Sequence, residues 1–517
     1  MIKSKMSSHL TTAAAQSVLA DGRLPEPKAI WDYFLAMVET PRGSGFPDLP
    51  REKIIGFGKE LGLETERDEA GNVIIRKPAT PGYESRPSVC LQAHYDMVTV
   101  AAEGLTFDFT KQPLVPRIVE SPDKAFGQYA LMATDTSLGA DNGIGCGIVL
   151  AILADKTLKH GPIEGLFTTD EETTMYGATN IKKGFIKSPY LINVDSEEDW
   201  RITIGCAGGF EDELTLPLKK DNIEGAAIRI ELKGLQGGHS GVEIHKGRAN
   251  ALKLLGQLIH QTTLHCNLEG KFGLQYFVGG DKRNVIPPNA RCGIVVPAAS
   301  KAEFMTELKK QEELLKQEWK TIEKDMKFIE TEGAIDKHVS YDYESTRKFL
   351  DVVLIAPHGV MRMSPDVEGL VETSINFCKA VLCDKPECHA ARFEFFPRSS
   401  DNDYMPVVHE QLKALARTVG ANITDMPNIF PGWLPDTANP LLTLSVETYK
   451  EIHGKEPEIY AIHAGLECGM FQASHPGLKC ISVGPYMVDV HSPKETLFID
   501  TVPGSYKLLT TVLEKIH

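Results

Sequence analysis

Side chains that can bind metal ions stand at the ends of five apolar runs. They are His94 and Asp96 in LQAHYDMV, Asp141 in LGADNGIG, Glu171 and Glu172 in FTTDEETT, Asp195 in LINVDSEE, and His463 in AIHAGLECG. Imidazole and carboxylate ligands without a thiolate suit Zn²⁺, Mn²⁺ or Co²⁺ in an open, catalytic site. Two such ions that share a carboxylate can stabilise both an attacking hydroxide and the oxyanion that forms. The set therefore favours a catalytic metal centre.

Each of these motifs taken alone also has an ordinary structural explanation. His94 and Asp96 share one face of a strand, but a lone His-x-Asp is more often a surface pair. Asp141 can simply cap a helix, and a single histidine such as His463 is usually structural. The glycines after Asp141 do not form a nucleotide loop, because GxGxxG needs glycine where Ile148 stands and no GK[ST] follows.

A crowded acidic segment follows the third of these runs. Asp170, Glu171 and Glu172 are consecutive, and like charges packed together are costly unless a cation neutralises them or one is protonated. A solvated acidic loop would explain the same charges. The occurrence of all five run endings in one chain, rather than any single motif, favours the metal centre.

The first part of the chain alternates helix and strand patterns. Helices are expected at 29–38, 51–61 and 142–153, and short apolar strands at 72–76, 88–93, 165–169 and 190–194. Buried parallel strands have such short apolar runs, and functional residues gather beyond their carboxyl ends. We therefore expect an α/β, three-layer catalytic domain with a mixed, mostly parallel sheet.

The pattern changes after residue 207. Strands are expected at 227–232, 274–278, 372–380 and 391–396, with a long Glu- and Lys-rich helix at 302–326 and another helix at 403–416. Later segments resemble the first part again, with helices at 441–453 and 505–516 and a strand at 480–483. We expect a discontinuous catalytic domain at 28–207 and 432–517, interrupted by an α+β lid and dimerisation domain at 208–431. Residues 1–27 are expected to form a disordered extension.

The composition is that of an ordinary globular protein. Of 517 residues, 42% are hydrophobic and 24% are charged, and the net charge of 55 − 70 = −15 disfavours nucleic acid and anionic membranes as partners. Ten scattered cysteines without a CxxC pair indicate reduced thiols in a cytoplasmic compartment. No apolar run approaches the roughly 20 residues needed to span a bilayer. The first twenty residues contain no acids and weakly resemble an organelle transit peptide.

From Trp31 onwards, the motifs and their order resemble a known family. The quoted segments are NVIIRKPAT, LQAHYDMV, LGADNGIG, LINVDSEE, GCAGG, GLVETS, FPGWLPD, IHAGLECG and GPYMVDVHSP. They are similar to the dinuclear metallopeptidases that include carnosinases, aminoacylases and tripeptide aminopeptidases. The resemblance implies hydrolysis of unblocked dipeptides, with carnosine-like Xaa-His dipeptides preferred. The alternatives are an N-acyl amino acid hydrolase on the same scaffold and a catalytically inactive binding relative.

The resemblance also implies a role for each metal-site residue. His94 and Asp195 would hold one ion, Glu172 and His463 the other, and Asp141 would bridge them. The ions would be zinc, with manganese or cobalt as alternatives. The peptide bond after the bridging aspartate would be cis.

Catalytic roles follow from the same resemblance. Asp96 would orient His94, and Glu171 would act as general base toward a metal-bridged water. His239 in GLQGGHSG would donate to the substrate carbonyl, whereas Asn284 and Arg398 would bind the substrate carboxylate. Without the family, His239 would be taken as a loop histidine and Arg398 as part of a surface salt bridge.

The resemblance implies a homodimer but leaves open whether His239 serves its own active site or a partner's. Two positions depart from the family pattern. Tyr95 replaces a leucine and should point to the opposite strand face. Asp170 adds an acid beside the base, which affects the expected metal preference and pH optimum.

Overall fold

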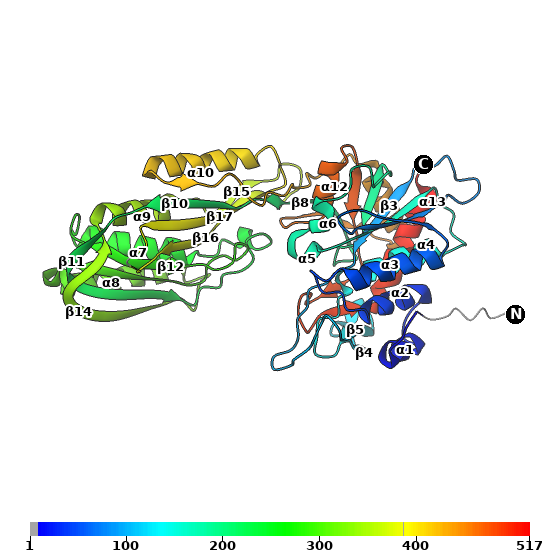
Figure 1. The fold of residues 1–517 in the computed structure, drawn as a ribbon, viewed down its shortest axis with the longest axis horizontal. Helices are drawn as coiled ribbons and strands as arrows, with labels where there is room; N and C mark the ends of the chain where they lie inside the picture. The colour runs from blue at the N-terminus through cyan, green and yellow to red at the C-terminus, as the bar shows by residue number, and fades with distance from the viewer. Residues whose placement is uncertain (1–8, 386) are drawn as a thin grey trace. The chain divides into compact units, whose positions relative to one another are not determined.

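The computed structural model describes residues 9–385 and 387–517. The chain forms two compact units (Figure 1). The first holds the chain up to Gly205 together with Pro435–Ala461 and Leu466–His517, and the second holds Cys206–Leu434 and Ile462–Gly465. The boundaries between the units differ by two or three residues from the expected ones, a short segment with His463 joins the second unit, and the first unit also includes residues before 28. Within the described residues, no helix is long and apolar enough to cross a membrane.

The first unit is built on a mixed sheet of eight strands in the order β1-β2-β6-β3-β7-β20-β8-β19. Its central strands β6, β3, β7 and β20 run parallel, whereas β1, β2 and β8 join antiparallel. A second sheet has the order β21-β22-β5-β4. The elements are α1 (Ala13–Ala20), α2 (Lys28–Val38), α3 (Asp48–Glu60), β1 (Glu64–Arg67), β2 (Val73–Lys77), β3 (Val89–His94), β4 (Pro116–Glu120), β5 (Tyr129–Ala133), α4 (Ala140–Ala154), β6 (Ile163–Thr168), α5 (Glu171–Thr174), α6 (Tyr176–Thr179), β7 (Tyr190–Asn193), β8 (Arg201–Cys206), α11 (Pro440–His453), β19 (Glu458–Ile462), α12 (Cys468–Ser474), β20 (Lys479–Ser482), β21 (Met487–Val488), β22 (Thr496–Phe498) and α13 (Val502–Lys515).

The central strands and helices of this unit are buried in its core. Strands β3 and β6 are buried along their whole length, as expected for parallel strands covered on both faces. Helix α4 packs on β3 and against α2, and both helices are almost entirely buried. Most side chains of these strands are apolar, with buried Gln92 and Glu164 as exceptions, and the candidate ligands stand at or just beyond the carboxyl ends.

In its described residues, the second unit contains one antiparallel sheet and four α-helices. The strand order is β14-β11-β13-β12-β16-β17-β10-β18, with β15 beside β16 and β9 beside β17. Helices α8, α7, α9 and α10 pack side by side in that order. The elements are β9 (Gly208–Gly209), β10 (Asp212–Pro217), β11 (Lys220–Lys233), α7 (Ala251–His265), β12 (Gly273–Gly279), β13 (Ala290–Val296), α8 (Lys301–Trp319), β14 (Lys327–Tyr341), α9 (Tyr343–Ile355), β15 (Gly359–Met363), β16 (Val371–Leu382), β17 (Ala390–Ser399), α10 (Met405–Val419) and β18 (Asn422–Ile423).

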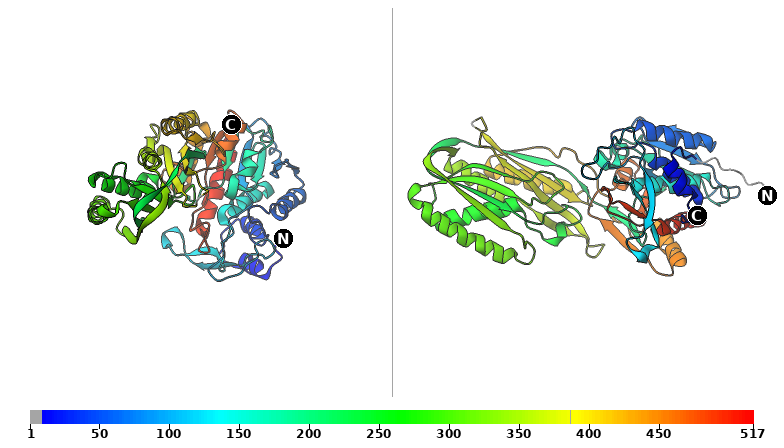
Figure 2. Two further views of the ribbon diagram at one scale, coloured as in Figure 1. Left: turned by 60° about the vertical axis from the view of Figure 1, so that its left-hand side comes forward. Right: turned by 90° about the horizontal axis from the view of Figure 1, so that it is seen from below.

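The mixed sheet and the separate inserted domain confirm the predicted fold class, and Figure 2 shows both units from two further directions. One helix is shorter than predicted, because α8 ends at Trp319 rather than near residue 326. The carboxylate of Glu323 accepts hydrogen bonds from the backbone N–H groups of Gln236 and Ala249, which holds the chain in a turn at that point.

Two further expectations need correction. The prediction of disorder for residues 1–27 is wrong for residues 9–27, where α1 buries Ala15 and Val18, and residues 1–8 lie outside the described part. The carboxylate of Glu39 accepts the N–H groups of Thr11 and Thr12 and ties this segment to α2. The cysteines are not all reduced thiols, because a disulfide joins Cys383 and Cys388 between β16 and β17.

Candidate metal centre

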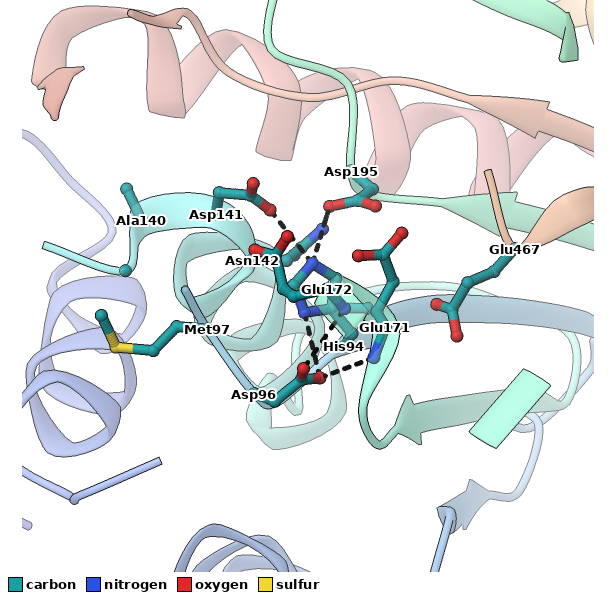
Figure 3. A network of polar contacts seen from close by, with 12 residues as sticks. His94, Asp96, Met97, Ala140, Asp141, Asn142, Glu171, Glu172, Asp195 and Glu467 are labelled. Atoms are coloured by element: carbon teal, nitrogen blue, oxygen red, sulfur yellow. Dashed lines mark hydrogen bonds and ion pairs between the residues drawn. The ribbon is translucent and has the colours of Figure 1, made fainter. Parts of the chain in front are cut away.

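Three adjacent parallel strands bring the first group of candidate site residues to one edge of the sheet. His94 is the last residue of β3, and Asp195 follows β7 by two residues. Glu171 and Glu172 open the short helix α5 just after β6. Because β6, β3 and β7 are neighbours and parallel, their carboxyl ends meet at the same place. This is the arrangement that the run endings predicted (Figure 3).

Asp141 reaches the cluster from the start of α4. Gly139 adopts a left-handed conformation with φ 66°, and Asp141 itself has non-helical φ/ψ at a kink in the helix. The Asp141–Asn142 peptide bond is cis, which confirms the expectation drawn from the family resemblance. The Asn142 side chain donates to the carbonyl of Val194 at 2.8 Å and also contacts Asp195. The kink therefore fixes the two aspartates relative to each other.

The carboxylate of Asp141 lies between two imidazoles. Its Oδ1 is 3.0 Å from Nε2 of His94, and its Oδ2 is 3.0 Å from Nε2 of His491. His94 Nε2 is also 3.4 Å from Oδ1 of Asp195, and His491 Nε2 is 2.9 Å from Oε2 of Glu172. The five side chains thus form two sets, each with one imidazole and one carboxylate of its own, and both sets share Asp141.

His491 takes the place in this cluster that the sequence analysis assigned to His463. His463 belongs to the second unit, where its Nε2 lies 2.7 Å from Oγ of Ser374. We therefore correct the expected ligand set. His491 follows the two-residue strand β21 and has φ 60°, so no apolar run marks it. The only sequence signal was its place in the quoted segment GPYMVDVHSP.

Asp96 lies behind His94, as expected. Its Oδ1 is 3.4 Å from Nδ1 of His94, and Ser44 donates its hydroxyl to Oδ2 at 2.7 Å. The same carboxylate accepts the backbone N–H groups of Glu171 at 3.1 Å and Glu172 at 3.4 Å. A single buried carboxylate therefore contacts both the His94 imidazole and the turn that carries Glu172, two candidate ligands.

Burial dominates the electrostatics of the cluster. It raises the pKa of Glu171 well above its ordinary value, and the charges of Glu172 and Asp195 act in the same direction. Burial raises the pKa of Glu172 to about 7, and the charge of Asp141 adds to this. For His94, burial would lower the pKa, but Asp195 and Asp141 raise it well above the usual range. Closely packed carboxylates with few cationic neighbours are the environment that divalent cations neutralise.

The residues present fit a pair of metal ions. His94, Asp141 and Glu172 place ligand atoms within 4.8 Å of one another. Oε1 of Glu172 is buried and has no hydrogen-bond partner in the described part of the chain, so an acceptor is left for a cation. The donor set is imidazole nitrogen and carboxylate oxygen, which suits zinc and neighbouring transition metals.

Two buried side chains of opposite charge, Glu495 and Arg42, hold the turn that carries Asp141 by hydrogen bonds to its backbone. The carboxylate of Glu495 accepts the N–H groups of residues 138–141 at 2.6–3.3 Å. The guanidinium of Arg42, which is 2% exposed, donates to the carbonyl oxygens of Tyr95, Asp96 and Gly139. Sequence reasoning missed both residues, because neither ends an apolar run.

The predicted substrate-binding residues lie in the second unit. Nδ1 of His239 accepts the backbone N–H groups of Gly241 and Val242, both at 3.2 Å. Burial and the nearby charge of Arg398 lower the pKa of His239 to about 4, so the ring is neutral and carries its proton on Nε2. Residues 239 and 285 form an isolated β-bridge, and the carbonyl of Asn284 accepts the N–H of Ser240 at 2.8 Å, so Asn284 lies beside the His239 loop.

Arg398 is not the surface arginine that composition alone would predict. It is 5% exposed, its guanidinium lies 4.7 Å from the ring centroid of Phe396, and its Nε has no hydrogen-bond partner among the described residues. Burial, and then the charge of Arg283, lower the pKa of Arg398 to about 10. A buried guanidinium with an unused donor is suited to an anionic ligand group.

The two departures from the family pattern have simple structural outcomes. Tyr95 points away from the cluster, as expected, and donates its hydroxyl to the carbonyl of Gly71 at 3.1 Å. The Asp170 carboxylate accepts the N–H of Gly45. The pKa of Glu171 is raised first by burial and then by Glu172, rather than by the neighbouring Asp170.

Comparison with known proteins places the chain in a family. Over 494 residues it is 38% identical to the cytosol non-specific dipeptidase of Escherichia coli strain K12, covering 95% of this chain and 98% of the relative. Residues 230–323 match the peptidase dimerisation domain of M20 peptidases. The chain belongs to the M20 metallopeptidase family.

Solved structures agree with this membership. The aminoacylhistidine dipeptidase of Vibrio alginolyticus superposes on this M20 peptidase with a TM-score of 0.84 and 36% identity, covering 96% of this chain and 98% of that one. A tripeptidase of Staphylococcus aureus, with a TM-score of 0.53 and 13% identity, shares the fold. The chain is thus a homologue of M20 dipeptidases along nearly its whole length.

Proposed function

We propose that this M20 peptidase hydrolyses unblocked dipeptides in a metal-dependent reaction and prefers Xaa-His dipeptides. The observation that carries the proposal is the Asp141 carboxylate, whose two oxygens face His94 and His491 separately. The names of the two full-length relatives, a non-specific dipeptidase and an aminoacylhistidine dipeptidase, support the substrate class. The presence of these side chains supports an active enzyme over the inactive relative considered as an alternative.

The two ligand sets would hold two divalent cations. His94 and Asp195 would bind one, Glu172 and His491 the other, and Asp141 both. We propose zinc, with manganese and cobalt as the alternatives. When bound, such ions polarise a peptide carbonyl and lower the pKa of a water molecule.

Glu171 is the general base in this proposal. It is next to the ligand Glu172, and its backbone N–H is held by Asp96, so its position is set by the same carboxylate that orients His94. Burial raises its pKa, which suits a group that must accept a proton from water and then release it to the leaving amine.

His239 and Arg398 are the proposed substrate-binding groups of the second unit. Because Nδ1 of His239 accepts two backbone N–H groups, its Nε2–H is available to donate to the substrate carbonyl oxygen as negative charge develops there. Arg398 would bind the free carboxylate of the dipeptide, with Asn284 as a further polar contact. The match to a peptidase dimerisation domain supports a homodimer, and the name of the Escherichia coli relative supports a cytoplasmic location.

A metal-analysed substrate profile tests the proposal. The purified protein is stripped with a chelator, dialysed, and reloaded with Zn²⁺, Mn²⁺ or Co²⁺, and bound metal is quantified by mass spectrometry. We expect two ions per chain and hydrolysis of Leu-His and carnosine that depends on them. Activity on N-acetyl amino acids with none on dipeptides would instead identify an N-acyl amino acid hydrolase. Full dipeptidase activity in metal-free protein would refute the metal mechanism.

A further inference from the structure

One buried acid beside the metal centre has no role in the proposed reaction. Glu467 directly precedes α12 and is completely buried, and Figure 3 draws its side chain together with those of the cluster. Its Oε2 accepts hydrogen bonds from Nε2 of Gln92 at 2.6 Å and from Oγ1 of Thr168 at 2.8 Å. Its Oε1 has no hydrogen-bond partner among the described residues. A carboxyl group in such a place needs a physical explanation, because buried charges are normally paired.

The carboxyl of Glu467 begins a row of polar side chains that crosses the sheet. Oε1 of Gln92 accepts from Nδ2 of Asn193 at 2.6 Å, and Oδ1 of Asn193 accepts from the hydroxyl of Ser482 at 2.5 Å. The hydroxyls of Ser482 and Ser196 are 2.8 Å apart. Thr168, Gln92, Asn193 and Ser482 lie on β6, β3, β7 and β20, which are consecutive strands in the sheet. We call Glu467, Thr168, Gln92, Asn193 and Ser482 the buried polar row.

The buried polar row lies directly below the metal ligands. Gln92 precedes His94 by two residues, and Asn193 precedes Asp195 by two. Gln92 and Asn193 are also paired residues in the parallel register of β3 and β7. Since side chains two apart on a strand share a face, Gln92 and His94 point to the same side of the sheet. The hydrogen bond between Gln92 and Asn193 therefore fixes the positions of β3 and β7 relative to each other two residues before His94 and Asp195.

The surroundings of Glu467 disfavour a charge on its carboxyl group. The two donors that reach it, an amide and a hydroxyl, are uncharged. Burial raises the pKa of Glu467 to about 8, and the acids Asp195 and Asp96 raise it further, whereas His94 acts in the opposite direction. A neutral carboxyl adds no further negative charge to a cluster that already contains five acids.

We propose that Glu467 is a positioning residue for the metal centre. Through its hydrogen bonds from Gln92 and Thr168 it anchors the buried polar row, which holds the carboxyl ends of β3, β6 and β7 in register for metal binding. The inference rests on the proposed function, because it presumes that the cluster binds metal. Glu467 itself binds neither metal nor substrate.

Two substitutions at Glu467 separate hydrogen bonding from charge. Glu467→Gln keeps an oxygen that can accept both hydrogen bonds but can never carry charge. Glu467→Leu has a similar volume and removes both hydrogen bonds. Zinc affinity is measured by competition with a chromogenic chelator, without any peptide substrate. Steady-state kcat and KM are measured separately on the zinc-loaded protein.

We expect Glu467→Gln to bind two zinc ions with an affinity within about threefold of the unmodified chain, since hydrogen bonding is preserved. Glu467→Leu should bind zinc at least about tenfold more weakly, a typical effect for residues that support metal ligands, and should lose kcat more than KM. The proposal is overturned if Glu467→Gln is as impaired as Glu467→Leu, because the charged form would then be the active one. It is also overturned if Glu467→Leu binds zinc normally.

A second variant covers the case in which Glu467→Leu does not fold. Thr168→Val removes one hydrogen-bond donor from the row while preserving shape, and it should weaken zinc binding in the same direction but less. Unchanged zinc affinity in Thr168→Val would count against the row. A chain that binds no zinc in its unmodified form would refute the proposed function instead, so the two failures are distinguishable.

Glu164→Gln is the matched control. Glu164 is buried on the same strand as Thr168, but it pairs with Arg76 and accepts N–H groups from Lys187 and Ser188. Loss of its charge should lower the melting temperature and leave zinc affinity unchanged. A parallel loss of zinc affinity in Glu164→Gln would show that any buried acid of this sheet has the same effect, and would overturn the specific role of Glu467.

Discussion

Asp141 and His491 are 350 positions apart in the chain, yet Oδ2 of Asp141 lies 3.0 Å from Nε2 of His491. Oδ1 of the same carboxylate faces His94 at the same distance. A carboxylate with one imidazole on each oxygen is the geometry expected of a ligand shared by two ions. This contact identifies His491 as the candidate histidine ligand of the second ion, and the assignment can be tested directly.

We predict that His491→Ala reduces bound metal from two ions to one per chain. Loss of an imidazole ligand leaves Glu172 and Asp141 as the remaining side chains of that ligand set. His463→Ala is the matched comparison, since His463 contacts Ser374 in the second unit, and it should keep two ions. Metal content after gel filtration decides between them. If His463→Ala lost an ion and His491→Ala kept both, the corrected ligand set would be wrong.

Glu171→Gln should abolish hydrolysis while leaving metal content near two ions per chain. The amide has a similar shape but cannot accept a proton from water, and loss of a general base typically costs ~10²–10⁴ in rate. Asp170→Asn is the control, because Asp170 is the neighbouring acid and its contact to Gly45 can be kept by an amide oxygen. It should retain nearly normal kcat. Normal turnover in Glu171→Gln would exclude Glu171 as the base.

His239→Ala should lower kcat by ~10²–10³ with little change in KM, because the donated hydrogen bond strengthens as charge develops on the carbonyl oxygen. The exposed His265 at the end of α7 provides a control substitution that should change neither constant. Steady-state kinetics on Leu-His separates the two parameters. A change confined to KM would contradict a role in oxyanion stabilisation.

Arg42→Met should destabilise the metal-free protein by about 2–4 kcal/mol, because it leaves the carbonyl oxygens of Asp96 and Gly139 buried without their donor. Gly143→Ala should act on the same contact, since a Cβ there would lie 2.6 Å from Nη2 of Arg42. Arg347→Met, at an exposed helical ion pair, should change stability by less than about 1 kcal/mol. Chemical unfolding of the metal-free proteins measures each change in the free energy of unfolding. Equal effects for Arg42→Met and Arg347→Met would contradict the structural role given to Arg42.

The second unit should lose stability in mild acid through His358. Burial, and then the charge of Lys253, lower the pKa of His358 to about 4 from the usual 6.5. The unfolded chain therefore binds the proton more readily, so the stabilisation is complete above pH 6.5 and is lost as pH falls toward 4. Between pH 7.5 and 5 the loss is about 2 kcal/mol for this residue. In His358→Gln the decline of the melting temperature over this range should be smaller, and an unchanged decline would exclude His358 as its source.

The sequence pattern alone could predict those site residues that lie at the ends of regular strands. His94 and Asp195 stand at or just beyond the ends of short apolar runs, and Glu172 follows another. Parallel strands bring such endings to one edge whatever the details of packing, so composition and spacing are enough to predict a shared site. The inserted domain could also be predicted from pattern. Apolar and polar residues alternate along its strands, and its long helix is rich in Glu and Lys, unlike the segments on either side.

Tertiary structure decided what no local pattern marks. His491 sits in a turn with positive φ after a strand of two residues, and Glu495 and Arg42 approach the Asp141 turn from remote segments. His463 ends an apolar run as a ligand would, yet it belongs to the second unit. The end of an apolar run predicts only that a residue stands at the end of a strand, not which other residues it contacts. Which side chains then meet depends on how segments hundreds of residues apart are packed, and that is set by the whole core rather than by neighbours in sequence.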